Sequence, residues 1–327
     1  MRRAIRCGML GVGHAHATGK LHVLRHSPDY ELVGVCEPDA AARLEAQGTE
    51  AFAGVRWLSQ QELLGDPSVE MIAVESDVPH LLELGHAAVR AGKHIHLDKP
   101  AGTSLPDFRA LLDEADRRDL IVQMGYMFRY NAGFDFVRRT IREGWLGRVH
   151  YVHGSIPTDP PRAIRRKLAF HPGGMMFELA CHLIDMVVLL FGRPDRVTPF
   201  LRHDGEPDDG LADNTLVVLE YERTLVVLES SCLETNPFPR RKFEVCGGKG
   251  TVVIQPLEPA AVCLCLREPA ADFQAGWQTV SVPDVPRYVR DLEELAECIR
   301  GEREFPYTKE HDFVVQETIL RSSGERA

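Results

Sequence analysis

Two short motifs carry the residues of this chain that are best suited to acid–base chemistry. Lys99 follows a run of apolar residues and stands directly before Pro100. Burial or a nearby positive charge lowers the pKa of a lysine from about 10.4, so that it can hydrogen-bond a reacting oxygen and help to carry its proton. Glu178, His182 and Asp185 follow about eighty residues later at positions i, i+4 and i+7. On a helix, this spacing presents all three side chains on one face.

His182 is the candidate general base of the second motif. A carboxylate one helical turn away orients an imidazole ring and stabilises its protonated form. Three other interpretations stay open: His182 is a buried core histidine, Asp185 is a structural hydrogen-bond anchor, or the group binds a metal. Two or three ligands from one helix without a distant partner make a weak metal site, so we predict no metal.

A glycine turn at Gly11 and Gly13 separates an apolar run from a helical pattern, the context that a dinucleotide-binding fingerprint requires. The two glycines permit a tight turn and a close approach of the backbone to a pyrophosphate. The third position of the fingerprint is His16, so the match is partial, and a purely structural turn is the alternative. His14 and His16 either approach the cofactor or cap the turn.

Glu37 ends the second apolar run, about twenty-four residues after Gly13. An acidic side chain at this offset accepts hydrogen bonds from the ribose hydroxyls of adenosine. Because a carboxylate there would repel a 2′-phosphate, we expect NAD rather than NADP. The alternative is a solvated glutamate at a strand end.

Size and composition limit the function classes. A chain of 327 residues predicts about two domains. A net charge of −10 argues against nucleic-acid binding. Residues 183–191 form the longest apolar helical stretch, which is too short to cross a membrane, and the glycine-rich start does not resemble a signal peptide. The eight cysteines form no C-x-x-C pair, which favours reduced thiols in a cytoplasmic protein.

Strands and helices alternate up to about residue 125. We expect strands at residues 4–10, 31–36, 71–74, 94–97 and 121–125, and helices at residues 15–26, from 38 onward, at 79–91 and at 104–118. This alternation predicts an α/β fold with a doubly wound parallel sheet, which has helices on both faces. We place Lys99 just past the fifth strand of that sheet, at the carboxyl edge where ligands bind.

The pattern changes after residue 125. We expect a helix at 133–143, a strand at 149–153, a proline- and arginine-rich loop at 155–172, a helix at 175–191, strands at 216–221, 224–232, 243–247, 251–254, 261–266 and 278–282, and closing helices at 285–300 and 309–321. Consecutive short strands predict a mostly antiparallel sheet in an α+β domain. The expected domains are 1–125 and 126–327, with the closing helices packing back on the first domain.

Arg162 lies in the proline- and arginine-rich loop. It either binds a substrate carboxylate or phosphate, or belongs to a solvated or interface segment.

Four motifs in order resemble one family. They are Gly-Val-Gly at 11–13, Ala-Gly-Lys-His at 91–94 before Leu-Asp-Lys-Pro at 97–100, the segment at 125–131, and Gly-Gly at 173–174 leading into residues 178–185. Across nearly its whole length the chain resembles the glucose–fructose oxidoreductase/inositol dehydrogenase (Gfo/Idh/MocA) family. The resemblance implies a Rossmann domain, a C-terminal domain whose open sheet often forms the oligomer interface of a homodimer or homotetramer, and NAD(P)-dependent chemistry at a CH–OH carbon of a sugar, polyol or related compound.

The resemblance also implies roles for individual residues. Lys99, with Pro100, lies near the nicotinamide and the reacting hydroxyl, and His182 is the acid–base residue of a motif that begins at Glu178 and ends at the substrate-side Asp185. Tyr126 and Arg129 match the segment that approaches the nicotinamide and the substrate. The sequence departs from the family pattern at four positions, where Asp98 replaces glutamate, Glu178 replaces aspartate, and Ala180 and His16 replace glycine.

These observations predict an NAD-dependent oxidoreductase that acts on a small-molecule sugar or polyol. Two alternatives remain open. One is a glycoside hydrolase that uses bound NAD as an internal redox shuttle, and the other is a non-catalytic dinucleotide-binding regulator on the same fold.

Overall fold

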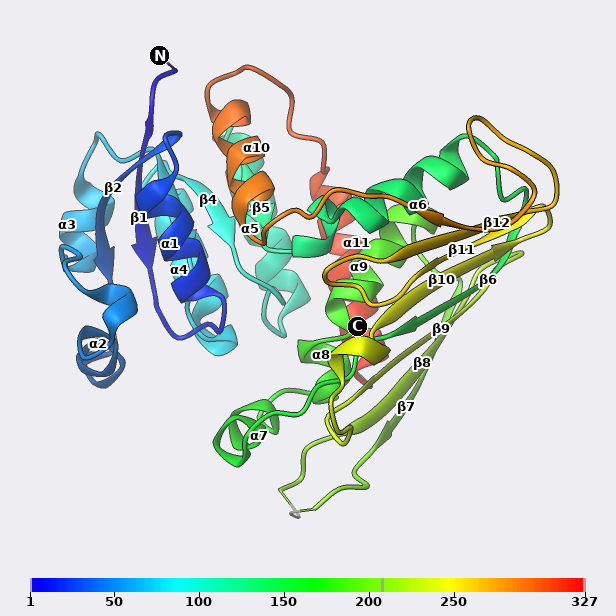
Figure 1. The fold of residues 1–327 in the computed structure, drawn as a ribbon. Helices are drawn as coiled ribbons and strands as arrows, with labels where there is room; N and C mark the ends of the chain where they lie inside the picture. Colours follow the sequence, from blue (N-terminus) through cyan, green and yellow to red (C-terminus); the bar gives the residue numbers. More distant parts are fainter. Residues whose placement is uncertain (1, 207–208, 326–327) are drawn as a thin grey trace. The chain divides into compact units, whose positions relative to one another are not determined.

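A computed structural model describes residues 2–206 and 209–325 (Figure 1). The chain divides into two compact units. The first comprises Met1–Met127 with Pro286–Phe313, and the second comprises Phe128–Val285 with Val314–Ala327. The C-terminal part of the chain therefore contributes α10 (Val289–Ile299) to the first unit. The last helix, α11 (Lys309–Ser322), has residues in both units.

The first unit contains the expected parallel sheet, with the strand order β2-β1-β3-β4-β5. Its strands are β1 (Ile5–Leu10), β2 (Tyr30–Cys36), β3 (Met71–Val74), β4 (His94–Leu97) and β5 (Val122–Met124), and the helices between them are α1 (Ala17–His26), α2 (Ala40–Gln47), α3 (Gln60–Gly65), α4 (Val78–Arg90) and α5 (Leu105–Arg117). Side chains of Asp39, Ser59 and Ser104 cap α2, α3 and α5 by accepting backbone N–H groups of the first turn. Lys99 follows β4, which is the fourth strand and not the fifth as expected.

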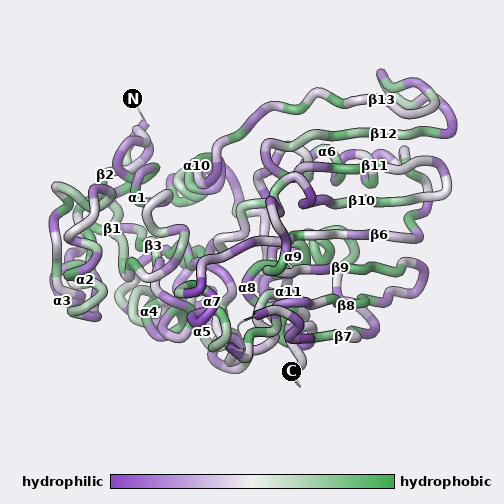
Figure 2. Tube along the Cα trace, turned by 60° about the horizontal axis from the view of Figure 1, so that its bottom comes forward, coloured by the Kyte–Doolittle hydropathy of each residue, from purple (hydrophilic) through white to green (hydrophobic). Residues whose placement is uncertain are grey.

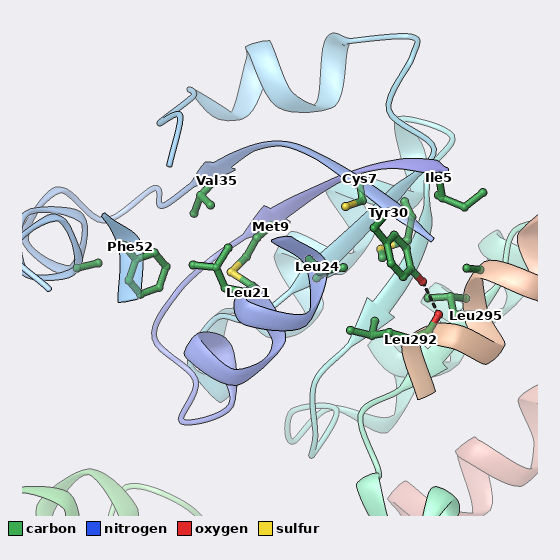
Figure 3. Close-up of a cluster of buried hydrophobic side chains, with 14 residues drawn as sticks. Ile5, Cys7, Met9, Leu21, Leu24, Tyr30, Val35, Phe52, Leu292 and Leu295 are labelled. Atoms are coloured by element: carbon green, nitrogen blue, oxygen red, sulfur yellow. Dashed lines mark hydrogen bonds between the residues drawn. The ribbon is translucent and has the colours of Figure 1, made fainter. Parts of the chain in front are cut away.

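One face of this sheet is closed by α1 and α10. The buried side chains of Met9, Leu21, Leu24, Leu292 and Leu295 belong to a single apolar cluster (Figure 3). The Tyr30 hydroxyl in the same cluster donates a hydrogen bond of 2.6 Å to the carbonyl oxygen of Leu292. Buried hydroxyl groups need such a partner. Helix α10, which follows the second sheet in the sequence, is therefore part of the core of the first unit.

The second unit is built on an eight-stranded sheet, with the strand order β13-β12-β11-β10-β6-β9-β8-β7. The strands are β6 (Val149–Ser155), β7 (Arg196–Arg202), β8 (Asn214–Glu220), β9 (Leu225–Ser231), β10 (Lys242–Gly247), β11 (Gly250–Ile254), β12 (Val262–Leu266) and β13 (Gly276–Val280). All pairs are antiparallel except β6 with β9, which is parallel, so the sheet is mixed. Strand β7 was not predicted, because Pro199 and the charged residues at its ends interrupt its alternation. In Figure 2 the turns between these strands are largely hydrophilic.

Helices cover one face of the eight-stranded sheet. Phe134 of α6 (Ala132–Arg142) packs on Phe243 of β10, with ring centroids 5.0 Å apart. A Cβ added to Gly154 of β6 would lie 2.9 Å from the side chain of Leu183 in α9 (Cys181–Phe191). The absence of a side chain at Gly154 thus lets α9 approach the sheet closely.

Two expectations for the second unit were wrong. The loop at 155–172 contains a helix, α7 (Arg162–Leu168), which begins after Pro161. The single helix at 175–191 is two helices, α8 (Met175–Glu178) and α9, because the N–H of Ala180 bonds back to the carbonyl of Met175 and the N–H of His182 to that of Leu179. This irregular turn replaces the regular i→i−4 ladder.

Within the described residues, none of the helices is long and apolar enough to cross a membrane. All eight cysteines are free thiols.

Candidate functional site

The glycine turn of the first unit has the backbone geometry that only glycine adopts easily. Gly11 has φ = +85°, and a Cβ there would lie 2.6 Å from the backbone nitrogen of Ser76. The turn leads into the N-terminus of α1. Over the described ranges 2–206 and 209–325, no protein acceptor faces the N–H groups of Gly13 and Ala15 in hydrogen-bond geometry. Two backbone donors at a helix N-terminus therefore stay available to an anionic group such as a pyrophosphate.

Glu37 lies directly beside this turn. One carboxylate oxygen accepts the N–H of Val12 at 2.8 Å, and the other accepts the N–H of Asp39 at 2.9 Å. The residue is 8% exposed. A carboxylate offers about four acceptor positions, so two amides fix its orientation and leave capacity for further hydroxyl donors.

Lys99 is 2% exposed, and the residue before it is fully buried. The carboxylate of Asp98 accepts the backbone N–H of Lys99 at 2.6 Å and the ammonium of Lys20 at 2.7 Å. Lys20 also pairs with Glu75 at 3.1 Å, and neither side chain is exposed. The carboxyl edge of the parallel sheet therefore holds a buried network of charged groups, with Asp98 at its centre.

The network shifts the pKa values of its members in opposite directions. Burial alone would raise the pKa of Asp98, but His14, Lys20 and His16 hold it well below its usual range. Burial, reinforced by Asp98, raises the pKa of Glu75 well above its usual value. Burial would lower the pKa of Lys20, yet Asp98 and Glu75 raise it overall. Asp98 and Lys20 thus form the ion pair, and Glu75 is the group that gains a proton first.

His14 and His16 both face Asp98. The His14 Nδ1 lies 3.0 Å from Asp98 Oδ2, and the His16 Nδ1 lies 3.2 Å from Asp98 Oδ1. Burial lowers the pKa of His16 to about 4. The three side chains have ligand atoms within 4.8 Å of one another, as a metal site requires. However, the ammonium of Lys20 already neutralises the carboxylate from 2.7 Å and would repel a cation. The chemistry of this donor set favours a hydrogen-bond network.

Tyr288, at the start of α10, packs over the first turn of α1. Its ring centroid lies 5.3 Å from that of His16 and 5.7 Å from the Lys20 ammonium. A Cβ at Gly19 would lie 2.6 Å from the same ring. Tyr288 was not predicted as a site residue, because more than 260 residues separate it from the glycine turn in the sequence and only the fold brings them together.

Lys20 and Glu75 were not predicted either, although the sequence pattern around each residue indicates burial or a place at the sheet edge. Lys20 shares a helical spacing with Ala17, Leu21 and Leu24, and all four are the buried residues of α1. Glu75 directly follows the apolar strand β3, at the carboxyl edge of the sheet. A lysine on an apolar helix face and a carboxylate at a strand end together predict a buried ion pair.

In the second unit, Arg129 and Asp185 bind each other. The guanidinium contacts both carboxylate oxygens, with Nη2 2.6 Å from Oδ1 and Nε 3.1 Å from each oxygen. Arg129 is 1% exposed and Asp185 is fully buried. Both were predicted to bind substrate. The structure joins them in a bidentate ion pair of the kind that fixes two elements together.

The helix break separates Glu178 from His182. Glu178 ends α8, where its carboxylate lies 3.9 Å from the Nε2 of His171. His182 lies in the first turn of α9, is 1% exposed, and packs on Phe128 with ring centroids 5.4 Å apart. The three residues of the motif are therefore not on one continuous helix face, as the sequence analysis expected.

The basic segment of α7 has two kinds of arginine. Arg162 is exposed at the first position of the helix. Arg165 is buried, donates to both oxygens of Asp209 at 2.8 and 3.1 Å, and pairs with Asp213 at 2.9 Å. Arg165 therefore anchors α7 to the chain before β8, and Arg162 remains the candidate for substrate. Tyr126 and Pro100 are both buried in the first unit.

Comparison with known proteins matches both parts of the chain to one family. Residues 5–126 match the model described as "Oxidoreductase family, NAD-binding Rossmann fold", and residues 134–253 match the GFO/IDH/MocA C-terminal domain. The chain belongs to the Gfo/Idh/MocA family. The resemblance, the fold class and the prediction of an oxidoreductase with a nicotinamide cofactor are thereby confirmed.

Relatives include two inositol dehydrogenases. The scyllo-inositol 2-dehydrogenase (NAD(+)) of Bacillus subtilis is 24% identical over 92% of this chain and 88% of its own length. The myo-inositol 2-dehydrogenase of Thermotoga maritima is 25% identical over 80% of this chain and 78% of its own. Among solved structures, the UDP-N-acetylglucosamine 3-dehydrogenase GnnA of Acidithiobacillus ferrooxidans has the same fold, with a TM-score of 0.80, 18% identity, and coverage of 99% of this chain and 98% of its own.

Proposed function

We propose that the protein is an NAD-dependent dehydrogenase that acts on a CH–OH carbon of a polyol, a sugar or a related small molecule. The carrying observation is the pairing of the glycine turn with Glu37, whose carboxylate is oriented by the N–H of Val12 at 2.8 Å. The similarity to inositol dehydrogenases supports the substrate class.

The residues present fit a dinucleotide. In the turn formed by Gly11, Gly13, His14 and His16, the N–H groups of Gly13 and Ala15 would hold the pyrophosphate side, and Glu37 would accept the ribose hydroxyls. A fixed carboxylate at this position disfavours a 2′-phosphate through like-charge repulsion, which supports NAD over NADP. When bound, the nicotinamide ring supplies the acceptor for a hydride.

The chain's own groups would handle the proton. We assign to an imidazole nitrogen of His182 the acceptance of the substrate hydroxyl proton, with Glu178 as the acidic residue of the same motif. The Lys99 ammonium, beside Pro100, would donate a hydrogen bond to the reacting oxygen. Tyr126 and Arg162 would contact the substrate, whereas Arg129 and Asp185 would shape its site through their mutual ion pair.

Thermal unfolding with saturating dinucleotide tests this proposal. A ligand at a hundred times its dissociation constant stabilises the native state by about 2.7 kcal/mol, so NAD should raise the Tm clearly and NADP less. Glu37→Gln should reduce the difference between the Tm increases that NAD and NADP produce. A larger rise in Tm with NADP would contradict the assignment of Glu37.

A panel of inositols and other polyols tests the reaction itself, with NADH formation followed by absorbance. Turnover of a substrate without net NADH would favour the hydrolase alternative.

We propose that a homo-oligomer forms through the open face of the eight-stranded sheet. Residues on the helix-covered face, such as Val217 and Leu228, are fully buried, whereas Leu225 and Trp277 on the other face are 44% and 64% exposed. The register places these two residues in one row across β13, β12, β11, β10, β6 and β9. Large exposed apolar side chains at both ends of this row make the open face a candidate interaction surface.

A charge placed in this row should separate the subunits. We expect Trp277→Glu to lower the sedimenting mass from a dimer or tetramer to a smaller species, because the carboxylate would be buried without a partner. Leu44→Glu, which changes a 72% exposed leucine of the first unit, is the matched control. An unchanged sedimenting mass in Trp277→Glu would show that this face does not form the interface.

We also propose the cytoplasm as the location, because its reducing conditions suit eight free thiols.

A further inference from the structure

The backbone of Lys99 is held on both sides of its Cα atom. Its N–H donates to Asp98 Oδ1 at 2.6 Å, and its carbonyl oxygen lies 3.1 Å from the Nε2 of His14. These two groups belong to the two peptide planes that flank the Cα. Fixing both planes sets φ and ψ of Lys99, and with them the direction in which its side chain leaves the backbone.

The contact from His14 to the Lys99 carbonyl requires a hydrogen on Nε2. In the neutral form, Nδ1 accepts the backbone N–H of His16 at 3.2 Å, so the hydrogen is on Nε2 and points at the Lys99 carbonyl. In the protonated form, Nδ1 faces Asp98 Oδ2 at 3.0 Å and Nε2 still carries a hydrogen. A carbonyl oxygen only accepts, so His14 is the donor in these two forms, whereas a neutral ring with its hydrogen on Nδ1 would donate to Asp98 instead.

The other contact is held in place by charge. Lys20 binds Asp98 Oδ2 at 2.7 Å, which leaves Oδ1 directed at the Lys99 N–H. Lys20 is itself placed by Glu75 at 3.1 Å, and all three side chains are fully buried. Such a network resists rearrangement, because moving one member leaves a buried charge without its partner.

We propose that His14 and Asp98 are positioning residues that orient Lys99 for the reaction, with Lys20 holding Asp98. This inference rests on the proposed function, in which Lys99 contacts the reacting oxygen. It assigns the two histidines of the glycine turn different roles, since the Nε2 of His14 lies against the Lys99 carbonyl and the Nδ1 of His16 lies against Asp98 Oδ1. The turn that carries the cofactor signature thereby also sets the placement of the lysine.

Two matched substitutions at His14 separate a positioning role from packing. The amide nitrogen of glutamine reaches about as far as the Nε2 of histidine, whereas that of asparagine reaches only as far as Nδ1. His14→Gln therefore keeps a donor for the Lys99 carbonyl, and His14→Asn removes it. A displacement of about 1 Å lowers turnover by about 10²-fold. We expect that loss in kcat for His14→Asn, a much smaller loss for His14→Gln, and little change in KM or in the Kd of NAD for either.

The assay uses the full chain with NAD and the polyol of the panel that is turned over fastest. His22→Asn, at an exposed histidine of the same helix, is the control. Equal kcat values for His14→Asn and His14→Gln, or a higher kcat for His14→Asn, would overturn the positioning role. So would a loss that appears only in the Kd of NAD, because His14 would then act on the cofactor.

Crystal structures of the same variants with NAD give a second measurement that needs no substrate. Lys99 should be displaced in His14→Asn and in Asp98→Ala, and should keep its place in His14→Gln. An unmoved Lys99 in both displacing variants would overturn the proposal. If no polyol or sugar is oxidised, the proposed function fails, and these structures still decide whether His14 and Asp98 hold Lys99.

Discussion

Replacing Lys99 or His182 with alanine should lower kcat by about 10²–10⁴-fold, the range of a positioned acid–base group. Lys99→Ala removes the hydrogen-bond donor to the reacting oxygen, and His182→Ala removes the acceptor of its proton. Both side chains are almost fully buried, at 2% and 1% exposure, so water would not substitute freely for either. The loss of kcat is measured from steady-state rates of NADH formation with the polyol that the wild-type protein oxidises fastest.

Matched substitutions at exposed positions control for general damage. Lys167→Ala and His150→Ala change the same residue types at solvent-exposed sites of the second unit and should leave kcat within about twofold. The NAD-dependent rise in Tm should persist in His182→Ala. If both alanine variants turned over at near-normal rates, the assignment of acid–base roles to Lys99 and His182 would be wrong.

The sequence predicts best those parts of the molecule in which a local pattern decides the structure. The glycine turn, the five strands of the first sheet and the acidic end of β2 all follow from hydrophobic runs and turn residues. The family motifs identify the same positions. These features share one property, since their conformation depends on neighbours within a few residues.

The parts that escaped prediction depend on contacts between distant segments. The residues around Lys99 come from α1, from the end of β3 and from β4, so that only the folded sheet brings Lys20, Glu75 and Asp98 together. The parallel pairing of β6 with β9 is likewise a tertiary event, as the strands are separated by about seventy residues. The break between α8 and α9 was not predicted, because it contains no proline or glycine and the helical pattern of the sequence continues through it.

Asp185 gives the largest expected effect on stability. Asp185→Leu removes the bidentate carboxylate partner of Arg129, whose guanidinium is fully buried. Breaking such a pair costs about 3–5 kcal/mol, a large fraction of the stability of an ordinary domain. Urea unfolding should therefore show a much lower midpoint for the second unit, which contains both residues.

The double variant Arg129→Leu/Asp185→Leu distinguishes a structural pair from a substrate site. Removing both charges leaves no buried ion unpaired, so most of the lost stability should return. If the pair serves only the fold, the double variant should also keep the KM of the wild type. A protein that regains its stability but binds its polyol poorly would show instead that Asp185 or Arg129 contacts the substrate, as the family resemblance implies. A single variant without any loss of stability would contradict the structural role of the pair, because removing one partner of a buried ion pair is costly.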